Sequence, residues 1–155
     1  MNIHRDYAEL LELFEKHRVK YCIVGAYAVA FYAISRYTKD LDLFVEPNIE
    51  NGKKVLQALT EFGFKLKNIK ASEFETPGVI LQFGVEPIRI DIINEIDGCT
   101  FQEVWKGRKR GFYGPKKYNF IGLKELTKNK KKSGRKIDAV DLEVLAKLSS
   151  QAKTK

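Results

Sequence analysis

Residues 36–45 read RYTKDLDLFV, and the chain from residue 39 to residue 45 has the pattern of a β-strand. Apolar residues occupy alternate positions, as in an extended chain with a period of two: Leu41, Leu43 and Val45. The other side of the strand carries Asp40 and Asp42. The preceding segment, YCIVGAYAVAFYAI, is almost wholly apolar, so we expect the strand to run beside the middle of a core. Two carboxylates on one side of such a strand require an explanation.

Their spacing suits a metal ion. Residues i and i+2 of a strand point the same way, with Cα atoms roughly 6.5 to 7 Å apart. Two carboxylates at that spacing can converge on one divalent ion or hold a pair of ions. Mg²⁺ fits this arrangement, because it takes a few carboxylates and completes its shell with water and substrate phosphates. Alternatively, the two acids mark a solvent-exposed strand face.

A third acid lies in the strand IRIDII, residues 88–93. Asp91 interrupts an otherwise aliphatic strand, and the isoleucines on either side of it belong to the opposite face. A buried carboxylate is costly unless a cation or hydrogen bonds accompany it. On a strand adjacent to Asp40 and Asp42, Asp91 would complete a three-carboxylate metal site. The alternative is an exposed position on an edge strand.

A glycine separates a short buried strand at 20–24 from an apolar helix at 26–34. The N-terminus of a helix has free N–H groups and the positive end of the dipole, so it binds phosphate readily. Gly25 lets the backbone approach a ligand closely, and Ala26 follows it at the start of the helix. A single glycine at a strand–helix turn is also common for structural reasons alone.

Length and composition indicate one soluble domain. The chain has 155 residues, and we expect a single domain over 1–149 with a flexible tail at 150–155. No apolar run reaches the roughly 18 to 20 residues that cross a bilayer, and the amphipathic N-terminus does not resemble a signal peptide. Two widely spaced cysteines indicate neither a disulfide framework nor a zinc site. We therefore expect a cytoplasmic protein that does not bind membranes.

The net charge of +8 is concentrated near the C-terminus. Residues 106–136 contain 13 Lys or Arg and one acid, so this segment carries +12 and the remainder −4. A localised basic field favours a polyanionic ligand, such as nucleotide phosphates or nucleic acid. Alternatively, these charges form a solvated surface. The aromatic residues interleaved at 105–118 could stack bases, but such aromatics more often pin a hairpin to the core.

Hydrophobic periodicity and turn residues predict the other elements. Helices are expected at 6–18, 49–62, 123–131 and 135–149, with one helical turn at 101–105. Strands are expected at 64–68, 78–84 and 88–93, the last two forming a hairpin. Residues 105–122 read as an extended or hairpin excursion.

The order of these parts resembles the nucleotidyltransferase superfamily of the polymerase-β type. The likeness is to small stand-alone members related to abortive-infection toxins and to minimal nucleotidyltransferases. Their motif is approximately Gly-Gly or Gly-Ser, a helix, Arg-x-Thr-x-Asp-h-Asp-h with h apolar, and a later Asp. The matching residues are Gly25, Ala26, Arg36, Thr38, Asp40, Asp42 and Asp91. Ala26 stands where the family usually has a second Gly or a Ser.

The C-terminal segment resembles the closing segment of the same family, in which a Lys and an Arg precede an Asp-rich helix. The matching residues are Lys130, Arg135, Asp138 and Asp141. The resemblance covers about residues 20–148. It implies an α+β fold with a central mixed β-sheet flanked by helices and closed by C-terminal helices.

The resemblance also implies a metal-dependent transfer of a nucleoside monophosphate from a nucleoside triphosphate to a hydroxyl acceptor, with release of pyrophosphate. Asp40, Asp42 and Asp91 would be the catalytic metal ligands for Mg²⁺ or Mn²⁺, and Asp91 could also act as base. The phosphate-binding residues would be Gly25, Ala26, Arg36, Thr38, Lys130 and Arg135. Alternatively, Arg36 pairs with a local carboxylate, and Arg135 bridges to Asp138 or Asp141.

Two other functions remain open at this point. The chain could be a catalytically silent nucleic-acid-binding module that uses the basic segment 106–136, or an interaction protein such as one half of a toxin–partner pair. For the enzyme, the partners would be a nucleoside triphosphate and RNA, a protein or a small molecule as acceptor. A domain this small could need a partner or a homodimer to build its acceptor site.

Overall fold

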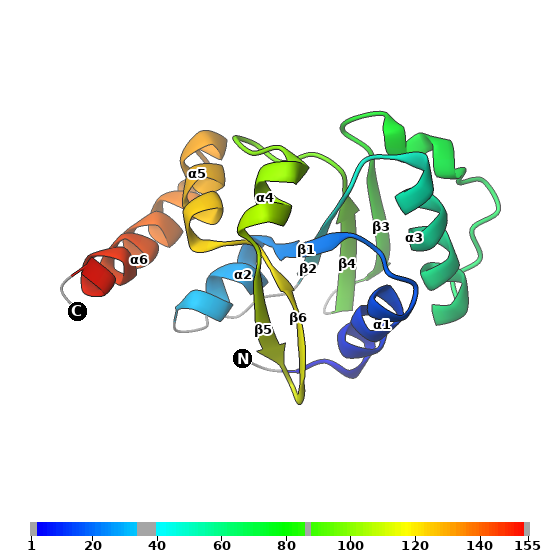
Figure 1. Ribbon diagram of the computed structural model, residues 1–155, viewed down its shortest axis with the longest axis horizontal. Coiled ribbons are helices and arrows are strands. Elements are labelled where there is room, and N and C mark those ends of the chain that lie inside the picture. The colour runs from blue at the N-terminus through cyan, green and yellow to red at the C-terminus, as the bar shows by residue number, and fades with distance from the viewer. Residues whose placement is uncertain (1–2, 34–39, 86–87, 154–155) are drawn as a thin grey trace.

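The computed structural model describes residues 3–33, 40–85 and 88–153. Arg36 and Thr38 lie outside the described residues. A six-stranded sheet forms the centre, with strand order β3-β4-β2-β1-β6-β5 (Figure 1). The strands are β1 (Tyr21–Val24), β2 (Asp40–Val45), β3 (Ile80–Val85), β4 (Ile88–Ile93), β5 (Lys109–Tyr113) and β6 (Lys116–Phe120). The β2–β4 and β1–β6 pairs are parallel and the other pairs antiparallel, so the sheet is mixed.

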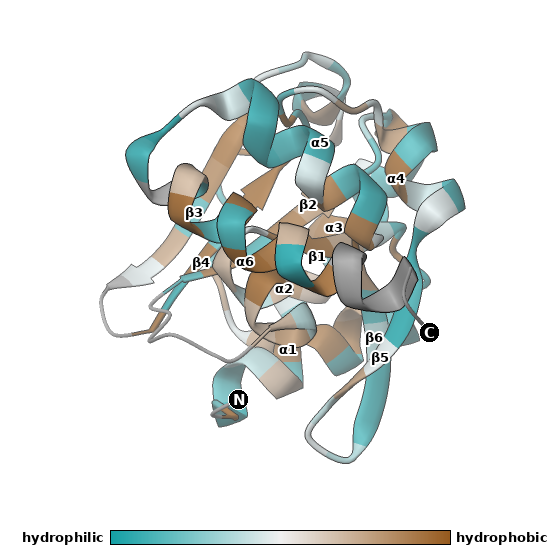
Figure 2. Cartoon of the chain, turned by 90° about the vertical axis from the view of Figure 1, so that its left-hand side faces the viewer, coloured by the Kyte–Doolittle hydropathy of each residue, from teal (hydrophilic) through white to brown (hydrophobic). Residues whose placement is uncertain are grey.

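Helices cover both faces of this sheet (Figure 1). They are α1 (Arg5–Lys16), α2 (Gly25–Tyr32), α3 (Ile49–Phe62), α4 (Phe101–Gly107), α5 (Leu123–Ser133) and α6 (Lys136–Lys153), with a 3₁₀ helix, η1, at Ala71–Glu75. Helices α1 and α3 pack on one face over a first hydrophobic cluster, and α4, α5 and α6 contribute to a second cluster. Figure 2 shows the apolar residues concentrated on the strands and the inward sides of the helices. The predicted α+β fold is therefore confirmed.

The alternation along β2 places its residues in both clusters. Leu41, Leu43 and Val45 are buried in the first cluster beneath α1 and α3. Phe44 faces the second cluster, where its ring meets Phe101 edge-on at 5.1 Å between centroids. Asp40 and Asp42 share the Phe44 side of the strand, because side chains alternate along it. Helix α4 therefore covers the end of this side that carries Phe44, and it leaves uncovered the end that carries Asp40 and Asp42.

One predicted strand, at 64–68, is wrong. This segment is irregular and leads into η1. Phe64 packs between aromatic rings, 5.2 Å from Phe62 and 4.4 Å from Phe83 between centroids, and so contributes to the first cluster without a strand partner. The same alternation of aromatic or aliphatic residues with lysines occurs in a half-buried loop, so it does not distinguish such a loop from a strand.

Other boundaries differ from the prediction in length. Helix α4 continues to Gly107, beyond the single turn expected, and begins with a capping box between Thr100 and Glu103. Helix α6 runs to Lys153, past the end expected near residue 149. The excursion at 105–122 contains the β5–β6 hairpin, and its Tyr113 and Tyr118 are buried. These two aromatic side chains anchor the hairpin to the core, which is the structural role that the sequence analysis gave as the more common one for the aromatics at 105–118.

Across the described residues, no helix is both long enough and apolar enough to span a membrane.

Candidate active site

The parallel pairing of β2 with β4 brings the predicted acids together. In this register Asp42 lies opposite Asp91, and Asp40 lies opposite Arg89. Strand β4 is internal, between β3 and β2, and only 8% of Asp91 is exposed. The alternative reading of Asp91 as an exposed edge-strand residue is therefore wrong. Asp40 and Asp42 on one strand and Asp91 on the next form a single acidic cluster.

Arg89 completes this cluster, and the sequence reasoning missed it. Its Nη2 atom lies 2.9 Å from Asp40 Oδ2 and 3.2 Å from Asp91 Oδ2, so one guanidinium bridges both strands. The signal was present, because Arg89 and Asp91 are two residues apart on β4 and must share a face. Two of the three carboxylates, those of Asp40 and Asp91, therefore share one guanidinium.

Tyr7 of α1 fixes the backbone of Arg89. The Tyr7 hydroxyl accepts a hydrogen bond from the Arg89 N–H at 3.0 Å and donates one to the Arg89 carbonyl at 2.9 Å. Burial raises the pKa of Tyr7 to about 12, and the charges of Asp40 and Asp42 add to this rise. The hydroxyl therefore stays protonated beside the acidic cluster.

Asp42 lies against the turn that starts α2. Gly25 has φ +68°, a left-handed conformation that favours glycine, and a Cβ atom there would collide with the Asp42 carboxylate. Burial raises the pKa of Asp42 to about 7, with further contributions from the charges of Asp91 and Asp40, while Lys130 acts in the opposite direction. Asp42 is thus poised between its protonated and ionised forms near neutral pH.

The three carboxylates are of the ligand type that suits a divalent cation, but their present geometry is that of an ion pair with Arg89. Carboxylate oxygens are the ligands that Mg²⁺ and Mn²⁺ prefer. Asp91 Oδ1 is buried, and no N–H or hydroxyl group in the part of the chain that the structure describes donates a hydrogen bond to it. When Asp42 is protonated, its carboxyl shares a hydrogen bond with Asp91, which contributes to the raised pKa of Asp42. Within that same part, no three His, Cys, Asp or Glu side chains stand positioned to hold an ion. Arg89 already binds two of the three carboxylates.

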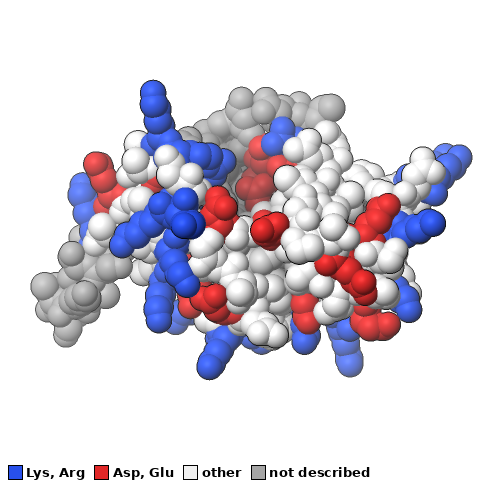
Figure 3. Space-filling view, turned by 90° about the horizontal axis from the view of Figure 1, so that it is seen from above, with Lys and Arg blue, Asp and Glu red and all other residues white. Residues whose placement is uncertain are grey.

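A cleft of about 570 Å³ opens beside this cluster. One wall comes from the sheet and the other from the α5–α6 junction. Its lining residues include Gly25, Asp42, Ile80, Glu95, Asp97, Asn129, Lys130, Ser133 and Arg135. Figure 3 shows acidic side chains around a hollow in this face and a group of basic side chains to its left. Four predicted site residues therefore share one cleft: Gly25, Asp42, Lys130 and Arg135.

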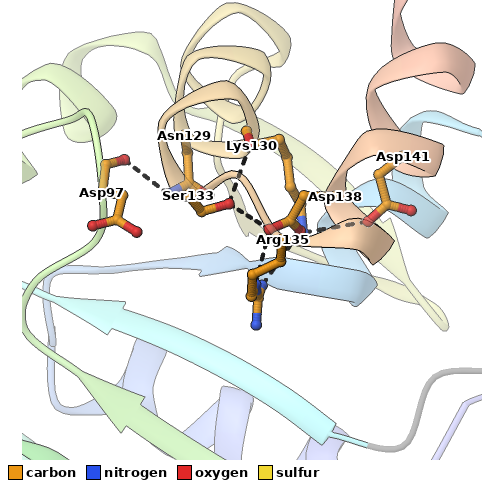
Figure 4. A network of polar contacts seen from close by, with 7 residues as sticks. All are labelled: Asp97, Asn129, Lys130, Ser133, Arg135, Asp138 and Asp141. Carbon is orange, nitrogen blue, oxygen red and sulfur yellow. Dashed lines mark hydrogen bonds and ion pairs between the residues drawn. The ribbon is translucent and has the colours of Figure 1, made fainter.

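Lys130 and Arg135 belong to a polar network at the α5–α6 junction (Figure 4). Lys130 is buried, with its Nζ 2.8 Å from Asp138 Oδ1 and 3.3 Å from Asp141 Oδ2. Asp138 also accepts a hydrogen bond from Arg135 Nε at 2.8 Å and one from the Ser133 hydroxyl. The predicted alternative for Arg135, a bridge to Asp138, is confirmed. Its side chain is nevertheless 68% exposed and faces the cleft.

The network sets the charge of Asp138. Burial opposes ionisation, but the hydrogen bonds from Arg135, Lys130 and Ser133 outweigh it and hold the pKa of Asp138 well below its usual range. Asp138 is therefore ionised at neutral pH and anchors Arg135 at the mouth of the cleft. The sequence reasoning offered the Arg135–Asp138 bridge as an alternative, but it missed the lining residues Glu95, Asp97 and Asn129, because the cleft forms only when the sheet meets α5.

The basic segment 106–136 is partly neutralised by acids from other elements. Arg110 forms an ion pair with Glu15 on α1, Lys116 lies 2.6 Å from Glu12 on the same helix, and Lys128 lies 3.0 Å from Glu103 on α4. Phe112, in contrast, is 60% exposed on the hairpin, with Lys117 over its ring. The predicted basic field is thus divided among several local pairs.

Solved structures share this fold. The crystal structure of lincosamide antibiotic adenylyltransferase LnuA with lincomycin bound matches with a TM-score of 0.62 and 18% identity, covering 96% of this chain and 99% of that one. TM1012 of Thermotoga maritima, assigned to the nucleotidyltransferases, matches with a TM-score of 0.59 and 11% identity, covering 99% and 97%. At these identities the likeness establishes the fold, which is a nucleotidyltransferase fold.

The sequence itself gives the family. Residues 3–155 match the family described as "Nucleotidyl transferase of unknown function (DUF2204)", and the chain belongs to that family. No curated protein matches the sequence significantly. The resemblance of the chain to the nucleotidyltransferase superfamily is confirmed, and by its family the protein is an enzyme of the nucleotidyl-transfer class.

Proposed function

We propose that this protein transfers a nucleoside monophosphate from a nucleoside triphosphate to a hydroxyl acceptor, releases pyrophosphate, and depends on Mg²⁺ or Mn²⁺. One observation carries the proposal. Asp42 and Asp91 lie opposite each other on parallel strands, with Asp40 two residues away and the glycine turn of α2 against Asp42. That arrangement gathers three hard-oxygen ligands beside a phosphate-binding helix start.

In this proposal Asp40, Asp42 and Asp91 hold the metal. The bound metal would neutralise phosphate charge as the α-phosphate is attacked. The acceptor oxygen forms a bond to the α-phosphorus, the bond to the β-phosphate oxygen breaks, and pyrophosphate leaves with that electron pair. In this proposal the acceptor proton passes to Asp91, the carboxylate opposite Asp42 on the neighbouring strand.

The remaining predicted residues would bind the triphosphate. Gly25 and Ala26 offer backbone N–H groups at the start of α2, although Ala26 supplies no hydroxyl. Arg135 presents an exposed guanidinium from the opposite wall of the cleft. Lys130 is committed to two aspartates, so its contribution would be its field at Asp42. We retain Arg36 and Thr38, outside the described residues, as triphosphate ligands.

A small molecule is the acceptor to test first. The printed description of LnuA is an adenylyltransferase of a lincosamide antibiotic, and that structure contains lincomycin. The match covers 96% of this chain and 99% of that chain. RNA and protein hydroxyls follow as the next acceptors, since the basic hairpin retains an exposed aromatic residue.

Calorimetry with each nucleoside triphosphate tests the proposal directly. Wild type, Asp42→Asn and the exposed α6 control Glu143→Gln would be titrated in Mg²⁺, in Mn²⁺ and in chelator. We expect metal-dependent binding in wild type and Glu143→Gln, and loss of at least about 100-fold in affinity in Asp42→Asn. If wild type binds no nucleoside triphosphate in Mg²⁺ and none in Mn²⁺, the proposal is rejected. Salt-sensitive RNA binding that survives Asp42→Asn, without transfer, would instead support the silent nucleic-acid-binding module.

A further inference from the structure

The guanidinium of Arg89 occupies the centre of the acidic cluster. It bonds Asp40 on β2 and Asp91 on β4 through the same nitrogen, Nη2. These oxygens belong to two of the three carboxylates proposed to hold the metal. A divalent cation and a guanidinium repel each other, so they cannot both remain full partners of the same oxygens.

The backbone of Arg89 is fixed, whereas its side chain reaches the surface. Two hydrogen bonds to the Tyr7 hydroxyl hold the peptide groups on either side of Arg89 Cα. The side chain is 32% exposed, which gives a long, flexible arginine room to turn without disturbing the strand. The carboxylates, in contrast, come from internal strands: β4 lies between β3 and β2, and β2 lies between β4 and β1.

We propose that Arg89 is an internal counterion, which holds Asp40 and Asp91 in the metal-free protein and gives way when the divalent cation binds. This inference rests on the proposed metal site and adds that the metal affinity is set by competition with Arg89. The Arg89 guanidinium neutralises part of the negative charge of the cluster. Three carboxylates within one patch would otherwise repel one another and destabilise the sheet at β2 and β4.

The competition makes metal and nucleotide binding interdependent. Metal alone must displace Arg89 and leave it without its carboxylate partners. A nucleoside triphosphate brings several negative oxygens to the same place, so a displaced Arg89 gains a phosphate partner. We therefore expect the cation to bind weakly alone and more tightly with nucleotide, and we expect Arg89 to be the residue through which the two are coupled.

The experiment measures Mn²⁺ binding by electron paramagnetic resonance, with and without a non-hydrolysable nucleoside triphosphate. The variants are Arg89→Gln, which removes the charge, and Arg89→Lys, which keeps it. Arg110→Gln is the matched control, because Arg110 also forms an ion pair but lies on the β5–β6 hairpin. We expect Arg89→Gln to bind Mn²⁺ alone about tenfold more tightly, with Arg89→Lys and Arg110→Gln close to wild type. The affinity gain caused by nucleotide should shrink in Arg89→Gln.

The outcomes separate this inference from the proposed function. If wild type binds Mn²⁺ and Asp42→Asn does not, but Arg89→Gln binds no more tightly than wild type, the metal site stands and the counterion role is wrong. Weaker binding by Arg89→Gln would also overturn it, since Arg89 would then organise the ligands. If no variant binds Mn²⁺ even with nucleotide, both proposals fail. Should Arg89→Gln not fold, side-chain NMR of wild type decides: the Arg89 guanidinium resonances must shift on Mg²⁺ addition.

Discussion

At the residue scale, the buried carboxyl of Asp42 lowers the stability of the folded protein. Its carboxyl lies between the turn at Gly25 and Asp91, its partner on the neighbouring strand β4. Burial and the neighbouring acids raise its pKa to about 7, so ionising Asp42 in the folded protein is unfavourable. A residue that is costly to the fold and indispensable to the proposed site is typical of catalytic positions.

We therefore predict that Asp42→Asn stabilises the metal-free protein at pH 8. Between about pH 4 and pH 7 the unfolded chain has released the Asp42 proton while the folded chain retains it. The unfolded state binds fewer protons there, so the free energy of unfolding falls as pH rises. The asparagine side chain does not ionise, so the Asp42→Asn variant lacks this loss of stability with rising pH. Denaturant unfolding should show Asp42→Asn about 4 kcal/mol more stable than wild type at pH 8, and nearly equal at pH 4. An equal difference at both pH values would contradict the assignment.

A second residue-scale prediction concerns Gly25. Gly25→Ala must adopt φ +68° and also displace the Asp42 carboxylate, whereas Gly134→Ala meets φ +66° with open space around its Cβ. We expect Gly134→Ala to cost about 1 kcal/mol and Gly25→Ala at least about 2 kcal/mol. Only Gly25→Ala should also lose metal-dependent nucleotide binding. Thermal unfolding and calorimetry on the two variants measure the difference, and equal effects on both would show that Asp42 adjusts without loss.

At the element scale, a buried ion network joins α5 to α6. Lys130 and Asp138 are 3% and 0% exposed, and their ion pair is accompanied by Asp141 and by hydrogen bonds to Asp138. Removing one partner of such a network leaves an uncompensated buried charge. Lys128, on the same helix as Lys130, forms an exposed ion pair with Glu103 of α4, and its removal lacks this consequence because water solvates both groups.

We predict that Lys130→Ala destabilises the protein by about 3 kcal/mol, whereas Lys128→Ala leaves its stability nearly unchanged. The two lysines lie on one helix and undergo the same substitution, so helix propensity cancels between them. Urea unfolding at pH 7 provides the measurement. Similar losses for both variants would mean that the α5–α6 junction does not depend on this network.

The same scale explains what the sequence could and could not predict. Strands β2 and β4 were predicted because a period of two in aliphatic residues is a local signal, and Asp40, Asp42 and Asp91 stand out against it. The bridge from Arg89 to Asp40 depends on the register between two strands that are 40 residues and more apart in sequence, which no local pattern encodes. The strand predicted at 64–68 was wrong for the opposite reason: the local alternation is present, but no neighbouring strand pairs with the segment.

At the scale of the whole molecule, the cleft has two walls from distant parts of the chain. One wall carries Ile93 at the end of β4 and Glu95 and Asp97 just after it, and the other carries Asn129, Lys130, Ser133 and Arg135. A volume of about 570 Å³ lies within the range of pockets for small molecules and cofactors. A nucleotide bound here would contact both walls, and so would tie the C-terminal helices to the sheet.

Hydrogen exchange with mass spectrometry tests this placement. With Mg²⁺ and a non-hydrolysable nucleoside triphosphate at about 100 times the dissociation constant, the bound state gains about 2.7 kcal/mol. We expect protection on both walls, in peptides covering 93–97 and 129–135, and at the start of α2, with little change in the β5–β6 hairpin. Chelator should abolish it, since the three carboxylates would repel the phosphates without a cation between them. Protection confined to residues 109–120 would place the anion on the basic hairpin, and the carboxylate cluster would then not be the site of nucleotide binding.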